Sequence, residues 1–176
     1  MIVLFKKILI IIILAVIFVT PIVKAQEHDF QEMNYSVFLG GNNTSLNINP
    51  VFQLQNELNR LSFDINYDSD AFRFGGTWLI TALEDPEYKT EAAFSILTGP
   101  NGAGFTAGIG VAGSRFLEKN RELLYELRYI LANKQFEYKI GYQTPIVKNN
   151  ALILSIGNSY WHASNLLLEV GFKVQF

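Results

Sequence analysis

Short stretches of alternating apolar and polar residues, separated by turn-forming residues, run through the chain from Met33 onward. Successive side chains of a β-strand point to opposite faces, so this period of two predicts strands with one apolar face and one polar face. The segment 46–55 shows the pattern clearly, with Leu46, Ile48, Phe52 and Leu54 on one face and Asn47, Asn49, Gln53 and Gln55 on the other. No helical pattern of comparable strength follows Met33.

Ten such segments can be counted, and they predict an all-β fold. The expected strands are 35–39, 46–55, 61–67, 72–81, 88–96, 104–111, 123–131, 136–143, 152–159 and 166–176. An even number of antiparallel strands fits a closed barrel with both chain ends on one side. We therefore expect a closed antiparallel transmembrane β-barrel of eight to ten strands, with ten preferred and eight strands with longer loops as the alternative.

The direction of the apolar face separates a membrane barrel from a soluble one, because a soluble lipocalin-like barrel turns its apolar face inward. An interior made from this chain's apolar face would be crowded with Phe, Tyr and Trp. Aromatic residues also gather near the expected strand ends, as membrane-interface girdles do: Tyr35, Tyr67, Tyr88, Tyr142, Tyr160 and Trp161. The pattern favours an apolar face turned toward lipid.

An outward apolar face leaves nine charged residues on the inner wall: Asp64, Arg73, Glu91, Glu126, Arg128, Glu137, Lys139, Glu169 and Lys173. Neighbouring strands are expected to place Asp64 near Arg73, and the Glu126/Arg128 pair near the Glu137/Lys139 pair. Charges removed from bulk water tend to pair. We expect a salt-bridged polar lumen that keeps the barrel rigid, with a narrow conducting pathway as the alternative.

The apolar alternation has exceptions at single positions. Leu124 and Ile130 place apolar side chains on the polar face of the segment 123–131. Gly104, Gly108 and Gly110 lie on the inner face of the segment 104–111, where glycine allows a bend or makes room for a bulky neighbour.

The first 25 residues have the composition of a signal peptide. Lys6 and Lys7 precede the apolar run 8–19, and Ala25 supplies the small residue at a cleavage site. An uncleaved anchor helix is the alternative, but Pro21 would interrupt it. We expect a signal peptide at 1–25, a periplasmic tail at 26–32 and the barrel at 33–176.

Composition narrows the function classes. The sequence contains no cysteine, which excludes disulfides and thiolate metal sites. Without residues 1–25 the chain has 11 basic and 16 acidic residues, a net charge of −5, which argues against nucleic acid as a partner. The two histidines, His28 and His162, lie far apart, and we expect neither a metal nor another cofactor.

The last eight residues read polar, any, Gly, any, any, apolar, any, aromatic, with Glu169, Gly171, Val174 and Phe176 at the defined places. This pattern resembles the closing strand of bacterial outer-membrane β-barrels. The resemblance implies an outer-membrane location, lipid as the surrounding partner, and recognition by the barrel-assembly machinery through Gly171, Val174 and Phe176.

A second, four-residue resemblance concerns His162-Ala163-Ser164-Asn165, which is similar to the His-x-Ser-Asn element of outer-membrane lipid A deacylases. It implies an alternative function, a lipid A acyl-ester hydrolase that uses His162 and Ser164, both with the outward parity of the preceding strand. The acid of that family has no counterpart, since Glu169 has inward parity. A non-catalytic structural or narrow-channel role is favoured, and a soluble periplasmic ligand-binding barrel is the second alternative.

Overall fold

The computed structural model describes residues 30–40, 43–54, 58–68, 71–102, 104–147, 149–162 and 166–175. The predicted signal peptide 1–25, Ser164 and Phe176 lie outside the described residues, as does the side chain of His162.

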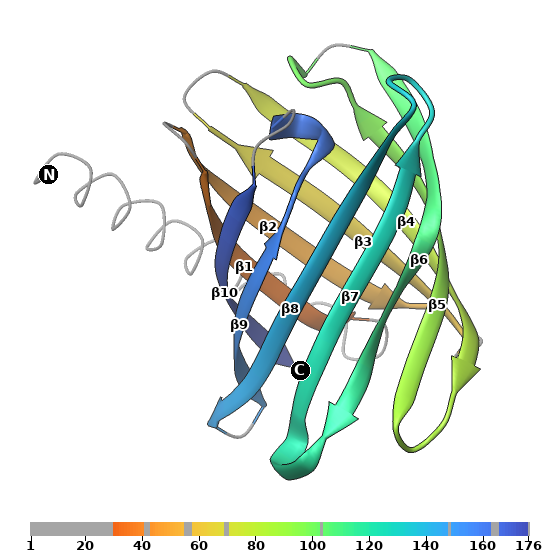
Figure 1. Ribbon diagram of the computed structural model, residues 1–176, viewed down its shortest axis with the longest axis vertical. Coiled ribbons are helices and arrows are strands. Elements are labelled where there is room, and N and C mark those ends of the chain that lie inside the picture. Colours follow the sequence, from red (N-terminus) through yellow and green to blue (C-terminus); the bar gives the residue numbers. More distant parts are fainter. Residues whose placement is uncertain are drawn as a thin grey trace, which may run out of the picture. The chain divides into compact units, whose positions relative to one another are not determined.

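Ten antiparallel strands close into a barrel in which each strand pairs with its neighbours in the sequence and β1 pairs with β10 (Figure 1). The strands are β1 (Phe30–Gly40), β2 (Asn43–Gln53), β3 (Asn59–Tyr67), β4 (Phe72–Glu84), β5 (Tyr88–Thr98), β6 (Phe105–Leu117), β7 (Arg121–Ile130), β8 (Gln135–Val147), β9 (Asn150–Gly157) and β10 (Leu167–Gln175). Two short 3₁₀ helices, η1 (Glu118–Asn120) and η2 (Tyr160–His162), lie between strands. The prediction of a ten-stranded closed barrel is confirmed.

No helix within the described parts of the chain is long and apolar enough to cross a membrane.

Several strands extend beyond their predicted limits. β6 continues to Leu117, through residues expected to form a connection, and β8 continues to Val147. β1 begins at Phe30, so residues 30–32 belong to the barrel wall and not to the predicted tail. Glu32 is held there by pairing with Gln175 of β10. Pairing with a neighbouring strand extends each element past the point where its own alternation ends.

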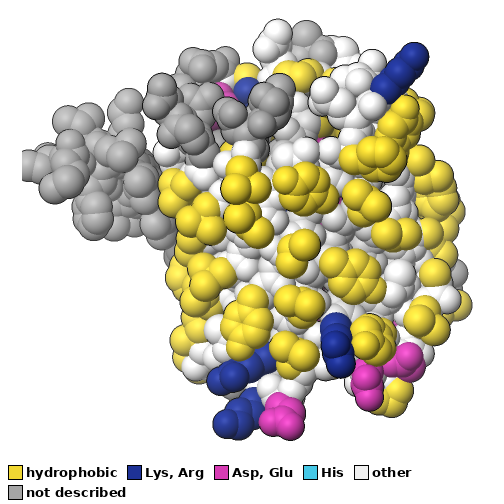
Figure 2. Space-filling view, viewed as in Figure 1, with side chains coloured by type: hydrophobic (Ala, Val, Ile, Leu, Met, Phe, Trp, Pro, Cys, Tyr) yellow, Lys and Arg dark blue, Asp and Glu magenta, His cyan; other side chains and the backbone are white. Residues whose placement is uncertain are grey.

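The barrel has apolar residues outside and polar residues inside. Among the described residues, 29 large hydrophobic side chains are exposed, while the buried set contains 16 polar or charged residues and only 9 hydrophobic ones. β4 shows the alternation, because Phe72 and Phe74 are 57% and 47% exposed whereas Arg73 between them is 6% exposed. Figure 2 shows hydrophobic side chains spread over the wall. This order is the reverse of a soluble lipocalin-like barrel and argues against the soluble alternative.

The inner face of β6 needs glycine because its neighbours occupy the space of a side chain. A Cβ at Gly110 would lie 2.0 Å from the backbone oxygen of Leu127 on β7. A Cβ at Gly108 would lie 3.0 Å from Cδ of Arg128 and from Cδ1 of Ile130. These glycines let Arg128 and Ile130 lie across β6 inside the lumen, as the sequence analysis expected of glycine here.

Candidate functional site

The lumen is the candidate site. Two cavities lined by described residues follow one another inside the barrel, and a third, of about 900 Å³, lies at the barrel end where β1 begins. We call the end of the barrel where β1 begins and β10 ends the terminus end, and the opposite end the loop end. A cavity of about 150 Å³ lies toward the loop end, and one of about 400 Å³ lies toward the terminus end. Both cavities are lined by Asn47, Asp64, Leu79, Ala112, Glu126 and Lys139, so these residues stand where the two meet.

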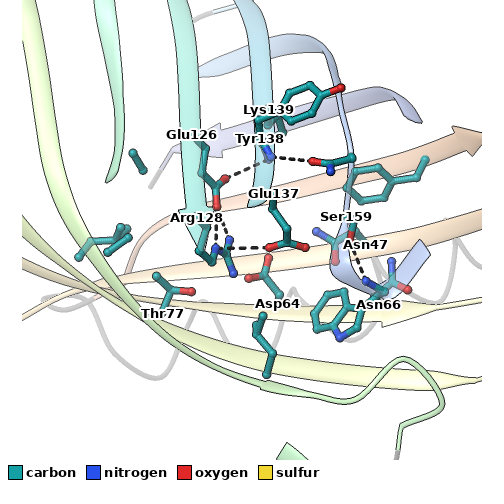
Figure 3. A pocket seen from close by; sticks show the side chains of 17 residues that line it. Asn47, Asp64, Asn66, Thr77, Glu126, Arg128, Glu137, Tyr138, Lys139 and Ser159 are labelled. Carbon is teal, nitrogen blue, oxygen red and sulfur yellow. Dashed lines mark hydrogen bonds and ion pairs between the residues drawn. The ribbon is translucent and has the colours of Figure 1, made fainter. Parts of the chain in front are cut away.

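Six charged residues near that junction form what we call the central cluster: Asp64, Glu126, Arg128, Glu137, Lys139 and Glu169 (Figure 3 shows five of them). The register of β7 and β8 sets Glu126 opposite Lys139 and Arg128 opposite Glu137. Side chains at directly opposed positions on one face of a sheet are within reach of each other. The sequence-predicted proximity of these two pairs is therefore present in the structure.

Arg128 and Lys139 each form ion pairs with two carboxylates of the central cluster. The Arg128 guanidinium donates to Glu126, with Nε at 3.1 Å from Oε1, and its Nε lies 3.6 Å from Oε2 of Glu137. Nζ of Lys139 lies 3.9 Å from Glu126 and 3.4 Å from Glu169. The Ser155 hydroxyl also donates to Glu169. The charges form a network that connects β7, β8 and β10, and β9 contributes the Ser155 hydroxyl to it.

Asp64 does not pair with Arg73, contrary to the sequence prediction. The register of β3 and β4 sets Gly75 opposite Asp64 and Asn66 opposite Arg73. Asp64 instead accepts a hydrogen bond from Nδ2 of Asn49 at 2.9 Å. In Figure 3 its carboxylate points toward Arg128 and Glu137 across the lumen.

Arg73 forms what we call the loop pair with Asp68, at an Nη1–Oδ2 distance of 2.5 Å. Its guanidinium also donates to the side-chain oxygen of Asn66 and to the backbone oxygen of Pro100. Asp68 and Pro100 lie in the connections that follow β3 and β5. Arg73 therefore holds two loops together at the loop end.

A third group, the terminal cluster, lies toward the terminus end and alternates in sign: Lys173, Glu32, Arg60, Glu91, Lys89 and Glu84. Lys173 lies 2.8 Å from Glu32, which is 3.9 Å from Arg60. Nε of Arg60 donates to Glu91 at 2.8 Å. Lys89 lies 4.0 Å from Glu91 and 3.7 Å from Glu84.

Of the terminal cluster, only Glu91 and Lys173 were predicted from the sequence to lie on the inner wall. Arg60 has the parity of Asp64 in β3, and Lys89 has the parity of Glu91 in β5. Extending the inner face of the segment 61–67 by one position would have found Arg60, and Lys89 already has inward parity within the predicted segment 88–96.

The described part of the connection between β9 and β10 folds into the lumen at the loop end. Tyr160 is 9% exposed and packs with Leu97 and Ile130, and Trp161 packs against this group. Nε1 of Trp161 donates to the backbone oxygen of Thr98 at 2.8 Å, and the backbone N–H of Tyr160 donates to Glu137. The expectation that Tyr160 and Trp161 face the lipid interface is therefore wrong. We call these two residues the plug.

The strand parity used to place His162 does not apply, because β9 ends at Gly157 and His162 belongs to η2. Ser164 lies outside the described residues. A catalytic role for the two residues therefore stays a prediction.

Of the predicted assembly residues, Gly171 and Val174 lie in β10. A Cβ at Gly171 would lie 2.8 Å from the Ser36 Cβ and from the Tyr35 backbone oxygen, so β1 approaches β10 closely there. Recognition of this strand by an assembly machinery stays a prediction.

The fold is similar to that of porins of solved structure. The chain is 11% identical to the KdgM porin, with a TM-score of 0.56 over 82% of this chain and 99% of the porin. A KdgM porin in complex with disordered oligogalacturonate gives the same TM-score and coverage at 10% identity. The sequence matches no protein-family model and no curated protein. At this level of identity the similarity concerns the fold.

Proposed function

We propose that the protein is an outer-membrane β-barrel with a structural or narrow-channel role. The observation that supports this most directly is the inverted barrel, with apolar side chains outside and charged side chains inside. The strands contain 8 to 13 residues, a range that includes the 9–11 residues or so that tilted strands need to cross a bilayer. Lipid is the environment that such an exterior requires.

The arrangement of side chains in the lumen supports restricted passage of solutes through the barrel. Its two cavities meet at charged residues of the central cluster, and the plug lies across the loop end. The plug has partners on three strands, since Tyr160 contacts Glu137 of β8 and packs with Ile130 of β7, and Trp161 contacts Thr98 of β5. We expect low conductance while the plug is in place.

The charges of this lumen do not favour the ligand named for the KdgM porin complex. Oligogalacturonate is a chain of sugar acids and carries one carboxylate per unit. The terminal cluster, the loop pair and the central cluster of this chain together hold eight acids and six bases. An excess of acids repels a polyanion. We therefore do not extend that ligand to this chain.

Conductance in planar bilayers tests the proposal. The unmodified protein should conduct poorly, and the double substitution Tyr160→Ala with Trp161→Ala should raise its conductance because it removes the plug. Trp78→Ala is the matched control, since Trp78 is exposed on the outer wall and its loss leaves the lumen unchanged. Large steady conductance of the unmodified protein would show that the lumen is open.

Delivery to the outer membrane rests on the two ends of the printed sequence. The proposal includes removal of a signal peptide after Ala25 and assembly through the closing strand. Intact-mass measurement on outer-membrane fractions should give a chain that begins at Gln26, and a retained segment 1–25 would contradict this part of the proposal.

A further inference from the structure

The acids and bases of the lumen are balanced in two of the three groups and unbalanced in the third. The terminal cluster has three acids and three bases, and the loop pair has one of each. The central cluster has four acids, Asp64, Glu126, Glu137 and Glu169, but only two bases, Arg128 and Lys139. Outside the three groups, Glu122 adds one acid at the terminus-end cavity, where its described partner is the amide of Gln143. The larger part of the excess negative charge, two acids, lies where the two cavities meet.

Asp64 is the acid of the central cluster with the weakest compensation. Glu126, Glu137 and Glu169 each have a base within 4 Å, whereas no described base reaches Asp64 at that distance. Its described hydrogen-bond donors are the neutral amides of Asn49 and Asn47, and the positive charges of Arg128 and Lys139 act on it only from beyond 4 Å. The amide nitrogen of Asn49 also donates to Ser62 and to the backbone oxygen of Phe63, so its two hydrogens are shared among three acceptors.

A second, independent observation lies beside Asp64. Asn47 is only 7% exposed, and its side-chain oxygen has no hydrogen-bond partner among the described residues. Asn47 stands opposite Asn66 on β3, two residues from Asp64 on the same inner face. Both Asn47 and Asp64 line both cavities. A buried amide oxygen left without a donor costs free energy unless a ligand or water satisfies it.

We propose that the central cluster binds a small monovalent cation, held by the Asp64 carboxylate and the side-chain oxygen of Asn47. Oxygen atoms with excess negative charge attract such a cation in a cavity of low dielectric constant. The cavity of about 150 Å³ has room for the ion together with several water molecules.

The arrangement does not suit a divalent metal. The described residues contain no group of three or more His, Cys, Asp or Glu side chains placed to coordinate a metal. The bound ion is therefore expected to keep part of its water shell and to bind by charge. The site requires only the lumen as described, and it does not depend on whether the lumen conducts.

Thermal unfolding of the purified barrel in uncharged micelles tests the site. The midpoint is compared in sodium chloride, potassium chloride and N-methyl-D-glucamine chloride at equal ionic strength, at pH 8 and a fixed urea concentration. The organic cation is too bulky for the smaller cavity. Sodium or potassium should raise the midpoint, and the rise should grow with the logarithm of the salt concentration once the site begins to saturate.

Three variants separate this site from a general salt effect. Asp64→Asn keeps the shape of the side chain but removes its charge, and it should abolish most of the difference between the salts. Asn47→Asp adds a carboxylate and should enlarge that difference. Glu118→Gln changes the net charge equally in the exposed helix η1, and it should leave the difference unchanged.

Equal midpoints of the unmodified protein in all three salts would overturn the proposal, as would full retention of the difference in Asp64→Asn. Because conductance is not measured, a conducting or a silent barrel can give either result. Failure of the cation site is thus distinguishable from failure of the proposed membrane role.

Discussion

Removal of the Arg128 side chain tests whether the central cluster stabilises the barrel. Arg128 has a side chain that is 11% exposed, and it serves both Glu126 and Glu137. Arg128→Ala leaves four carboxylates with one ammonium group, that of Lys139. It also leaves Glu137, the acceptor for the backbone of Tyr160, without its base.

Two effects set the size of the loss. Removing one partner of a buried ion pair typically costs about 3–5 kcal/mol, because a charge remains without compensation. The cavities beside the cluster admit water, which screens the stranded carboxylates and reduces that cost. We expect the free energy of unfolding to fall by between about 1 and about 5 kcal/mol.

Urea unfolding of the barrel in lipid vesicles, followed by tryptophan fluorescence, measures this loss. Lys139→Ala should cost less than Arg128→Ala, because the Lys139 side chain is 39% exposed. Adding Glu126→Ala to Arg128→Ala should recover part of the stability, since one stranded charge is then removed. If Arg128→Ala unfolded at the same urea concentration as the unmodified protein, the charges would not contribute to stability.

Three further predictions follow from the wall and the chain ends. Gly110→Ala should lower stability by about 1–3 kcal/mol, because its Cβ would meet a backbone oxygen, whereas Gly76→Ala, with its nearest contact at 3.8 Å, should be tolerated; urea unfolding compares the two. Deletion of Phe176 should reduce the yield of heat-modifiable folded protein in outer-membrane fractions, and Gln175→Ala should not. His162→Ala should leave the lipid A acylation pattern unchanged in mass spectra; loss of an acyl chain on overexpression, abolished by this substitution, would restore the enzyme alternative.

The strands and their faces could be predicted because alternation is a local property of the sequence. Phe72, Arg73 and Phe74 need no partner strand to show which of them share a face. The limits of the strands are different, because they depend on how far pairing with the neighbour continues. Glu32 and Arg60 belong to the inner wall for that reason, and each lies just outside the stretch where its own alternation is clear.

The partner of Asp64 could not be predicted because it depends on register. Adjacent strands place residues of one face near each other, but the turn determines which residues stand directly opposite. The connection between β3 and β4 sets Asn66 against Arg73, and Asp64, one inward position earlier in β3, stands opposite Gly75. A shift of two residues preserves every face and changes every ion pair. Alternation therefore predicted the composition of the lumen and not its pairing.

The plug was missed for a further reason, because strand parity was extended through residues 158–162, where the chain is no longer a strand. The sequence signal for the plug was on the barrel wall opposite to it. Ile130 is an apolar exception on a polar face, and Leu97 has the same inward direction on β5. An apolar side chain inside a polar lumen stabilises the fold only where other apolar side chains cover it and exclude water. Both residues lie at the loop end, where the nine-residue connection between β9 and β10 brings Tyr160 and Trp161. In this barrel the apolar exception at Ile130 thus marks the place where a loop folds inward.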